Sequence, residues 1–186
     1  MAPLSPRKPM TPLSGAAFVK KLAKLLKISR NQPAHFALAV SGGADSLSLL
    51  VLAAEAKQKN KHWDFSVLTV NHGFRAAAVQ ETRYVSKLAK AMGLPCKILT
   101  HKGAIPEKDI QSTARDIRYG LMFEWCVKNK VTYLLTAHHL EDQAETFLLR
   151  LARGSGLDGL SGMQSIRNYE GVALLRPFLD IPRERL

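Results

Sequence analysis

The stretch AVSGGADSLSLL, residues 39–50, interrupts an apolar run with two glycines and then resumes at once as an apolar helical pattern. Gly42 and Gly43 allow a sharp turn and a close approach of the backbone to a ligand. The helix that follows points its free N–H groups toward this turn, an arrangement that favours an anion. The stretch therefore predicts a phosphate-binding loop between a strand and a helix.

The loop lacks the fingerprints of the two commonest nucleotide-binding turns. Neither G-x-G-x-x-G nor G-x-x-x-x-G-K-[ST] occurs at this turn, which argues against hydride transfer and against ordinary hydrolysis of a γ-phosphate there. Ser41 and Ser46 add hydroxyl donors to the backbone cradle. Asp45 would repel a phosphate unless a divalent cation lay between them, so it suggests Mg²⁺. A tight turn without a ligand is the alternative interpretation.

From Phe36 onward, short apolar runs alternate with longer helical patterns. This βαβα order predicts a doubly wound, Rossmann-like α/β fold with a parallel sheet of about five strands and helices on both faces. Ligands bind such sheets beyond the carboxyl ends of the strands, so we expect SGGADS, NHGFR, THKGA and HHLEDQAE to converge there. The expected strands are 36–40, 65–70, 95–99 and 131–137, and the expected helices are 46–58, 77–92, 109–129 and 140–153.

The two ends of the sequence depart from this alternation. Residues 1–30 are expected to form a basic flexible tail and an N-terminal helix that Ser14 caps, and residues 31–186 to form the α/β domain. Near the other end, Asp180 is expected to cap a new helix with Pro182 in its first turn. Because the sequence stops there, we expect an N-terminal part of a longer protein whose C-terminal domains are missing.

The composition is that of a basic protein with a core of ordinary size. The chain has 186 residues, of which 46% are hydrophobic, and a formal net charge of +12. Residues 1–30 hold seven basic residues and no acidic one, so the surplus elsewhere is mild and limits the argument for a polyanionic partner. A solvated basic face is the alternative. No apolar run suits a membrane span and no signal peptide is recognisable, so a cytoplasmic location is expected.

Residues 41–46 resemble the S-G-G-x-D-S loop of the N-type ATP pyrophosphatases, which split ATP between its α- and β-phosphates and hold the pyrophosphate in this loop. Further stretches resemble one family within that superfamily, the tRNA(Ile)-lysidine synthetases. They are V-N-H-G-F-R at 70–75, A-R-D-I-R-Y at 114–119 and A-H-H-L-E-D-Q-A-E-T at 137–146, which runs into a glycine-rich stretch at 153–163. Phe74 and Glu141 depart from the family pattern, which has Leu and Asp at these positions.

The resemblance implies an ATP-dependent ligase that modifies tRNA. ATP would adenylate the C2 oxygen of the wobble cytidine in tRNA(Ile) with a CAU anticodon, and pyrophosphate would leave. The ε-amine of L-lysine would then displace AMP to give lysidine. The implied cofactors are ATP and Mg²⁺, the implied partners are tRNA(Ile) and L-lysine, and residues 31–186 would be the catalytic domain. A homodimer is left open.

Two carboxylates fit the lysine part of this reaction by their spacing. Asp142 and Glu145 lie i, i+3 near the start of a helix, where they could clamp a cationic amine and accept its proton. Acids at a helix start are also favoured by the helix dipole alone, which is the alternative. The core face of the same helix is expected to consist of Ala144, Phe147, Leu148 and Leu151.

Two arginines fit the phosphate part. Arg115 and Arg118 lie i, i+3 on a helix whose expected core face is Ala114, Ile117, Leu121 and Trp125. A guanidinium stays protonated and binds phosphate through fixed donors, so Arg118 could stabilise the departing pyrophosphate and Arg115 the substrate phosphate. Surface salt bridges are the alternative for both arginines, and an ordinary packed histidine is the alternative for His138.

The resemblance assigns the remaining roles residue by residue. The expected catalytic residues are Asp45, Arg118, Asp142 and Glu145. Of these, Asp142 and Glu145 are expected to bind L-lysine, and Asp45 is expected to bind Mg²⁺. A basic, glycine-rich loop could also grip an RNA backbone, so tRNA goes to Arg75, Arg150 and Arg153. ATP goes to Ser41, Gly42, Gly43, Ala44, Asp45, Ser46, His72, Arg115 and His138.

Two other functions are compatible with the loop. The first is thiolation of a tRNA cytidine, although enzymes of that kind usually carry C-x-x-C. This chain has only Cys96 and Cys126, which we expect to be buried as small hydrophobic residues. The second is a non-catalytic module that binds an adenine nucleotide as a sensor.

Overall fold

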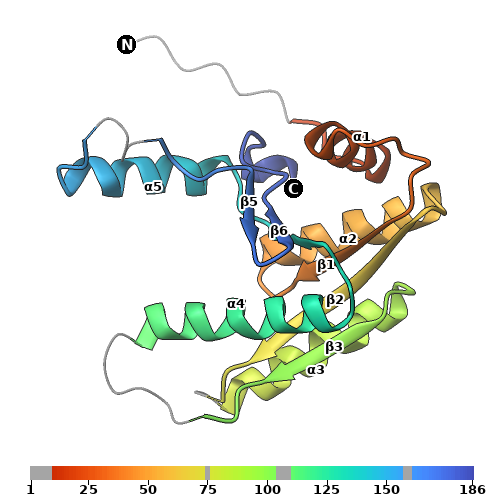
Figure 1. Cartoon of the computed structure of the whole chain (residues 1–186), viewed down its shortest axis with the longest axis horizontal. Coiled ribbons are helices and arrows are strands. Elements are labelled where there is room, and N and C mark those ends of the chain that lie inside the picture. The colour runs from red at the N-terminus through yellow and green to blue at the C-terminus, as the bar shows by residue number, and fades with distance from the viewer. Residues whose placement is uncertain (1–9, 74–75, 104–109, 157–160) are drawn as a thin grey trace, which may run out of the picture.

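The computed structural model describes residues 10–73, 76–103, 110–156 and 161–186 (Figure 1). One six-stranded sheet has the strand order β3-β2-β1-β4-β6-β5, with helices packed on it. The predicted α/β class is confirmed, with one strand more than expected. The strands are β1 (Ala34–Ala39), β2 (Trp63–Asn71), β3 (Cys96–Thr100), β4 (Tyr133–Leu135), β5 (Ile166–Tyr169) and β6 (Val172–Leu175).

Five of these strands run parallel, and the direction in which the chain adds strands to the sheet reverses once. From β1 the chain moves outward to β2 and β3, then returns to place β4 on the other side of β1. Strand β6 pairs with β4 in parallel, and β5 pairs with β6 in antiparallel fashion. The gap between the carboxyl ends of β1 and β4 is thus the switch point where doubly wound sheets bind ligands.

The long helices fall close to the predicted ranges. They are α1 (Gly15–Leu26), α2 (Ala44–Lys59), α3 (Ala76–Ala91), α4 (Ile110–Lys128) and α5 (Leu140–Ala152). Ser14 caps α1 as expected, because its hydroxyl accepts the N–H of Ala17 at 3.3 Å. None of the helices among the described residues is long and apolar enough to cross a membrane.

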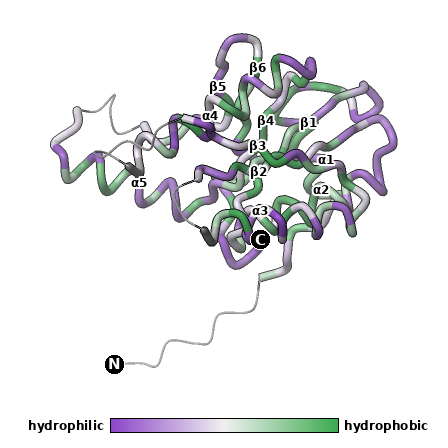
Figure 2. The backbone as a smooth tube through the Cα atoms, turned by 90° about the horizontal axis from the view of Figure 1, so that it is seen from below, coloured by the Kyte–Doolittle hydropathy of each residue, from purple (hydrophilic) through white to green (hydrophobic). Residues whose placement is uncertain are grey.

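Alternating side chains of the strands build two separate cores. On β1, Phe36 and Leu38 point to the face covered by α1, α2 and α3, while Ala37 points to the face covered by α4. Figure 2 shows hydrophobic residues along the central strands and hydrophilic ones on the outer turns. On α4 the fully buried residues are Met122 and Cys126, while Leu121 and Trp125 of the predicted core face are half-buried and pack against the same core, so that prediction is right in part.

The predicted core face of α5 is wrong. Phe147, Leu148 and Leu151 are 42%, 61% and 52% exposed, and no residue of this helix is buried. Figures 1 and 2 show α5 extending away from the sheet. The spacing of its apolar residues predicted the helix correctly, but no described element packs against that face.

The C-terminal segment crosses the start of α5 and ends beside α1. The expected helix is only a short 3-10 turn, η2 (Arg183–Arg185), and Pro182 rather than Asp180 occupies its N-cap. Asp180 instead forms an ion pair with Lys21 of α1 at 2.6 Å. The N–H of Leu13 donates to the carbonyl of Arg185 at 2.9 Å, which joins the two ends of the described chain. The division into residues 1–30 and 31–186 stays a prediction.

Candidate functional site

A cavity of about 740 Å³ lies at the carboxyl ends of the central strands. Its walls come from the segments that follow β1, β2 and β4 and from the facing sides of α3 and α4. Three of the four stretches expected to converge do so. The fourth, THKGA, is not among the described lining residues, and its Ala104 falls outside the described part of the chain. The predicted site residues that line the cavity are Ser41, Gly43, Asp45, Ser46, His72, Arg115, Arg118, His138 and Asp142.

The loop at 41–46 is held in shape by the hydroxyl of Ser46, which is buried. Its oxygen accepts the N–H groups of Ser41 and Gly42, each at 3.2 Å, and it donates to the carbonyl of Gly43 at 2.8 Å. Ser46 therefore holds the loop together from inside, and the hydroxyl of the exposed Ser41 lies 3.3 Å from that of Ser46 at the cavity.

The two glycines serve different purposes. Gly42 has a φ of +96°, a conformation that an L-residue rarely adopts, so the turn itself requires glycine. Gly43 has an ordinary φ of −73°, and an added Cβ there would meet only the Ser41 hydroxyl at 3.8 Å. The packing of the protein therefore does not require glycine at position 43, and the backbone of Gly43 lines the cavity.

Unpaired backbone N–H donors come directly after the two glycines in the sequence. Ala44 and Asp45 begin α2, and in the described structure their N–H groups have no hydrogen-bond acceptor. Such first-turn groups carry the positive end of the helix dipole. Together with the glycines they form an anion cradle at the switch point of the sheet.

The cradle and the fold agree with a known domain. The sequence profile of the family described as the PP-loop domain matches residues 15–186, which is almost the whole described chain. This chain belongs to the PP-loop domain family. Residues 41–46, which the sequence predicts to be the phosphate-binding loop, are called the PP-loop below, and the ATP-binding class of site expected from the sequence is confirmed at the family level.

Curated relatives share most of the PP-loop domain. A tRNA(Ile)-lysidine synthase from Anaplasma marginale is 47% identical over 151 residues, which are 81% of this chain and 32% of that protein. Another, from Methylobacterium nodulans, is 41% identical over 175 residues, 94% of this chain and 50% of that protein. The chain therefore spans about a third of the length of the first relative and half of the length of the second.

A solved structure shares the fold. It is a U34-tRNA thiolase from Methanococcus maripaludis with its [4Fe-4S] cluster, with a TM-score of 0.74 and 21% identity over 90% of this chain and 60% of that chain. At this identity the likeness supports the PP-loop fold alone. In the present chain, Cys96 packs on the α2 side of the sheet and Cys126 lies in the core on the α4 side, so the two thiols cannot share a cluster. Burial raises the pKa of Cys126 to about 12.

The wall opposite the PP-loop carries positive charge. Arg115 and Arg118 of α4 both lie over the ring of Tyr119, with guanidinium carbons 5.2 and 5.9 Å from its centroid. Burial, partly opposed by nearby Tyr119, lowers the pKa of Arg118, a guanidinium that still stays protonated at neutral pH. These arginines have no carboxylate partner among the described ion pairs, which leaves their charge available to an anion.

His138 is held neutral beside this wall. Its Nδ1 lies 2.8 Å from the hydroxyl of Thr136. Burial lowers the pKa of His138 to about 4, and the charge of the buried Arg176 adds to the effect. His138 can therefore hydrogen-bond a phosphate at neutral pH without adding a charge of its own.

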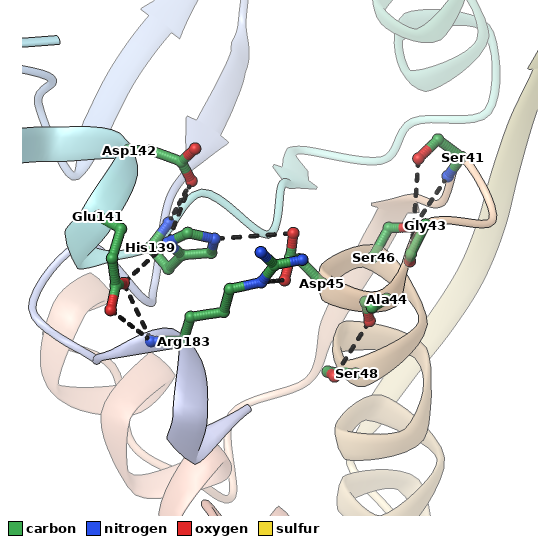
Figure 3. A network of polar contacts seen from close by, with 10 residues as sticks. All are labelled: Ser41, Gly43, Ala44, Asp45, Ser46, Ser48, His139, Glu141, Asp142 and Arg183. Atoms are coloured by element: carbon green, nitrogen blue, oxygen red, sulfur yellow. Dashed lines mark hydrogen bonds and ion pairs between the residues drawn. The ribbon is translucent and has the colours of Figure 1, made fainter. Parts of the chain in front are cut away.

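Asp45 lies at the centre of a network that sequence reasoning missed (Figure 3). The Nε of Arg183 lies 2.8 Å from its Oδ1, and the Nε2 of the buried His139 lies 3.6 Å from its Oδ2. On the other side of the ring, the Nδ1 of His139 lies 3.0 Å from Glu141. Slight burial opposes ionisation of Glu141, but N–H groups of its own backbone and of Arg183, together with His139, hold its carboxyl pKa below the usual range.

The fit of a divalent cation depends on Asp45. The described residues contain no group of three or more His, Cys, Asp or Glu side chains that could hold a metal ion. Asp45 does accept a cation, since the guanidinium of Arg183 lies against it. Mg²⁺ needs only one or two carboxylates when phosphate and water complete its octahedral shell. The geometry thus suits a Mg²⁺ ion that arrives with a nucleotide.

The predicted lysine and tRNA residues are spread more widely. Asp142 lines the cavity, and one of its oxygens accepts the N–H of His139 at 2.8 Å, which anchors the start of α5. Glu145 is exposed on α5 and is not among the described lining residues. Arg150, which donates to the carbonyl of Gly162 at 3.2 Å, and Arg153 also lie on or at the end of α5. Arg75 lies outside the described residues.

Proposed function

We propose that the protein is a tRNA(Ile)-lysidine synthase that uses this cavity to activate a tRNA cytidine with ATP. The observation that carries the proposal is the PP-loop itself, because it presents free N–H groups and a bare glycine to a cavity whose opposite wall is basic. Relatives between 39% and 47% identical that bear this name support it. A cytoplasmic location and a homodimer stay predictions from the sequence.

The layout of charge supports adenylation with loss of pyrophosphate. The PP-loop would hold the β- and γ-phosphates, with Asp45 as the protein ligand of Mg²⁺. Arg115, Arg118 and His138 line the same cavity. Arg115 and His138 would bind the substrate phosphate, and Arg118 would stabilise the departing pyrophosphate while the cytidine oxygen attacks the α-phosphate. Donors fixed in advance around a developing charge are the main source of stabilisation in such reactions. Bound Mg²⁺ would supply further neutralisation of the departing pyrophosphate.

The lysine step would follow at the start of α5. Asp142 faces the cavity and bears the negative charge that a lysine amine needs. Glu145 stands one helical turn further along, on the exposed side of α5, and would contact the amino acid from outside the cavity. The tRNA would approach from the same side, where Arg150 and Arg153 lie, because the carboxyl edge of the sheet is the open end of the domain.

The test is an assay of AMP formation by the whole protein with ATP, Mg²⁺, L-lysine and a tRNA(Ile) transcript that carries CAU. We expect pyrophosphate only when tRNA is present, and AMP and lysidine only when L-lysine is added as well. A transcript with uridine at the wobble position is the matched control and should give neither product. AMP formation that does not depend on L-lysine would instead favour a thiolase, and no release of pyrophosphate would favour a nucleotide sensor.

A further inference from the structure

The carboxylate of Asp45 is already occupied by a cation from the far end of the chain. Arg183 is 138 residues away in sequence, and its Nε donates to Asp45 Oδ1 at 2.8 Å. None of the sequence motifs includes Arg183. Figure 3 shows its side chain reaching across toward the first turn of α2.

Hydrogen bonds fix the backbone of Arg183, and they thereby position its side chain for the contact with Asp45. Its N–H donates to the carboxylate of Glu141, with distances of 3.2 and 3.0 Å to the two oxygens. Two residues earlier, the carbonyl of Ile181 accepts the N–H of Leu140 at 3.0 Å. The start of α5 therefore holds the turn, and the turn aims the guanidinium at the PP-loop.

The guanidinium of Arg183 has further N–H donors that could bind a ligand. Only Nε has a partner in the described structure, and the Arg183 side chain is 60% exposed while that of Asp45 is 34% exposed. The planar fork of an arginine matches phosphate oxygens as well as it matches a carboxylate. Exposed ion pairs contribute little to folding stability, so stabilising the fold is a weak reason for this one.

We infer that Arg183 is a phosphate-binding residue of the PP-loop that exchanges partners when a nucleotide binds. Without nucleotide, its guanidinium neutralises Asp45, which would otherwise place a negative charge beside the empty cradle. When a magnesium nucleotide enters, Asp45 turns to the cation and the guanidinium turns to the β- or γ-phosphate. The inference rests on the proposed use of ATP. It adds the guanidinium of Arg183 to the groups that would bind the β- and γ-phosphates.

Binding measurements on the whole protein test this. We compare wild type with Arg183→Gln, Arg183→Lys and the matched control Arg185→Gln, which lies on the same turn but donates to the carbonyl of Thr11. Calorimetry is run with ATP, pyrophosphate and AMP in the presence of Mg²⁺. We expect Arg183→Gln to weaken ATP and pyrophosphate roughly tenfold or more and to leave AMP unchanged. Arg183→Lys should fall between, and Arg185→Gln should match wild type.

A second readout needs no nucleotide. If the guanidinium competes for Asp45, its removal should let Mn²⁺ alone bind Arg183→Gln more tightly than wild type, by a factor of several. The urea midpoint should be the same in both proteins, because the backbone contacts of the turn remain. A midpoint that falls in Arg183→Gln but not in Arg185→Gln would show a structural role and overturn the inference.

The outcomes separate the inference from the proposed function. Wild-type affinity for ATP and pyrophosphate in Arg183→Gln, or an equal loss for AMP, would overturn the inference while lysidine formation could stand. Conversely, Arg183-dependent binding of pyrophosphate in a protein that forms no lysidine would uphold the inference and contradict the proposed reaction. A wild-type protein that binds neither ATP nor pyrophosphate would contradict both.

Discussion

The hydroxyl of Ser46 donates to the carbonyl of Gly43 at 2.8 Å and so closes the PP-loop from within. The same oxygen accepts the N–H groups of Ser41 and Gly42. The serine at the end of the S-G-G-x-D-S pattern thus shapes the cradle before any ligand is present. The hydroxyl at the other end, on Ser41, is the one that remains exposed at the cavity.

Ser46→Ala should lower both stability and nucleotide affinity. The change removes four hydrogen bonds from a buried position and leaves loop groups unpaired, which costs about 1–3 kcal/mol in the free energy of unfolding. Urea denaturation and ATP calorimetry measure the two effects. Ser48→Ala is the control, because Ser48 donates only to the carbonyl of Ala44 on an exposed part of α2. Equal behaviour of the two variants would contradict the bracing role.

Alanine at the two glycines should separate folding from binding. Gly42→Ala must hold a φ of +96° with a side chain, which costs roughly 1–3 kcal/mol. Gly43→Ala meets no atom closer than 3.8 Å, so its unfolding free energy should equal that of wild type. Its new methyl group would nevertheless stand in the cradle and abolish ATP binding. Normal ATP affinity in Gly43→Ala would show that the phosphates bind elsewhere.

His138 should stay neutral well below physiological pH. Its pKa is lowered to about 4, so the folded protein takes up its proton only near that pH, whereas the unfolded chain does so near 6.5. The contribution of His138 to stability is therefore fully present above about pH 6.5 and is lost as the pH falls toward 4. NMR titration of the ring should show this, and added pyrophosphate should move the pKa upward. An apparent pKa near 6.5 without ligand would contradict the buried position.

Asp142→Asn should separate lysine binding from helix anchoring. The amide oxygen can still accept the N–H of His139, so α5 should keep its start, but the charge that faces the cavity is gone. We expect the KM for L-lysine to rise roughly tenfold to a hundredfold, with little change in the KM for ATP. Glu124→Gln, at an exposed position of α4, is the control. An unchanged KM for L-lysine would remove Asp142 from the lysine site.

Local patterns allowed much of this domain to be predicted. The apolar run before Ser41, the glycine pair and the helix after it are neighbours in sequence, so their arrangement follows from turn and helix physics. The alternation of strands and helices likewise fixed the parallel sheet and placed the cavity at its carboxyl edge. Strands β5 and β6 were both missed, because the turn between them uses Glu170 and Gly171, both at positive φ, instead of the usual Asn-Gly.

Features that depend on distant partners were not predictable in this way. The apolar face of α5 has the spacing of a core helix, yet periodicity cannot reveal whether another element covers that face. The contact between Arg183 and Asp45 joins residues 138 apart, and no spacing rule links them. His139 lay inside a quoted motif, but only the fold shows that its ring stands between Asp45 and Glu141.

The most direct measurement is a crystal structure of the protein with Mg²⁺ and an ATP analogue whose α,β-bridge resists cleavage. The account predicts that the β- and γ-phosphoryl oxygens accept the N–H groups of Ala44 and Asp45, over the bare backbone of Gly43, with the cation at the Asp45 carboxylate. Terminal phosphoryl groups bound anywhere else in the cavity would contradict it.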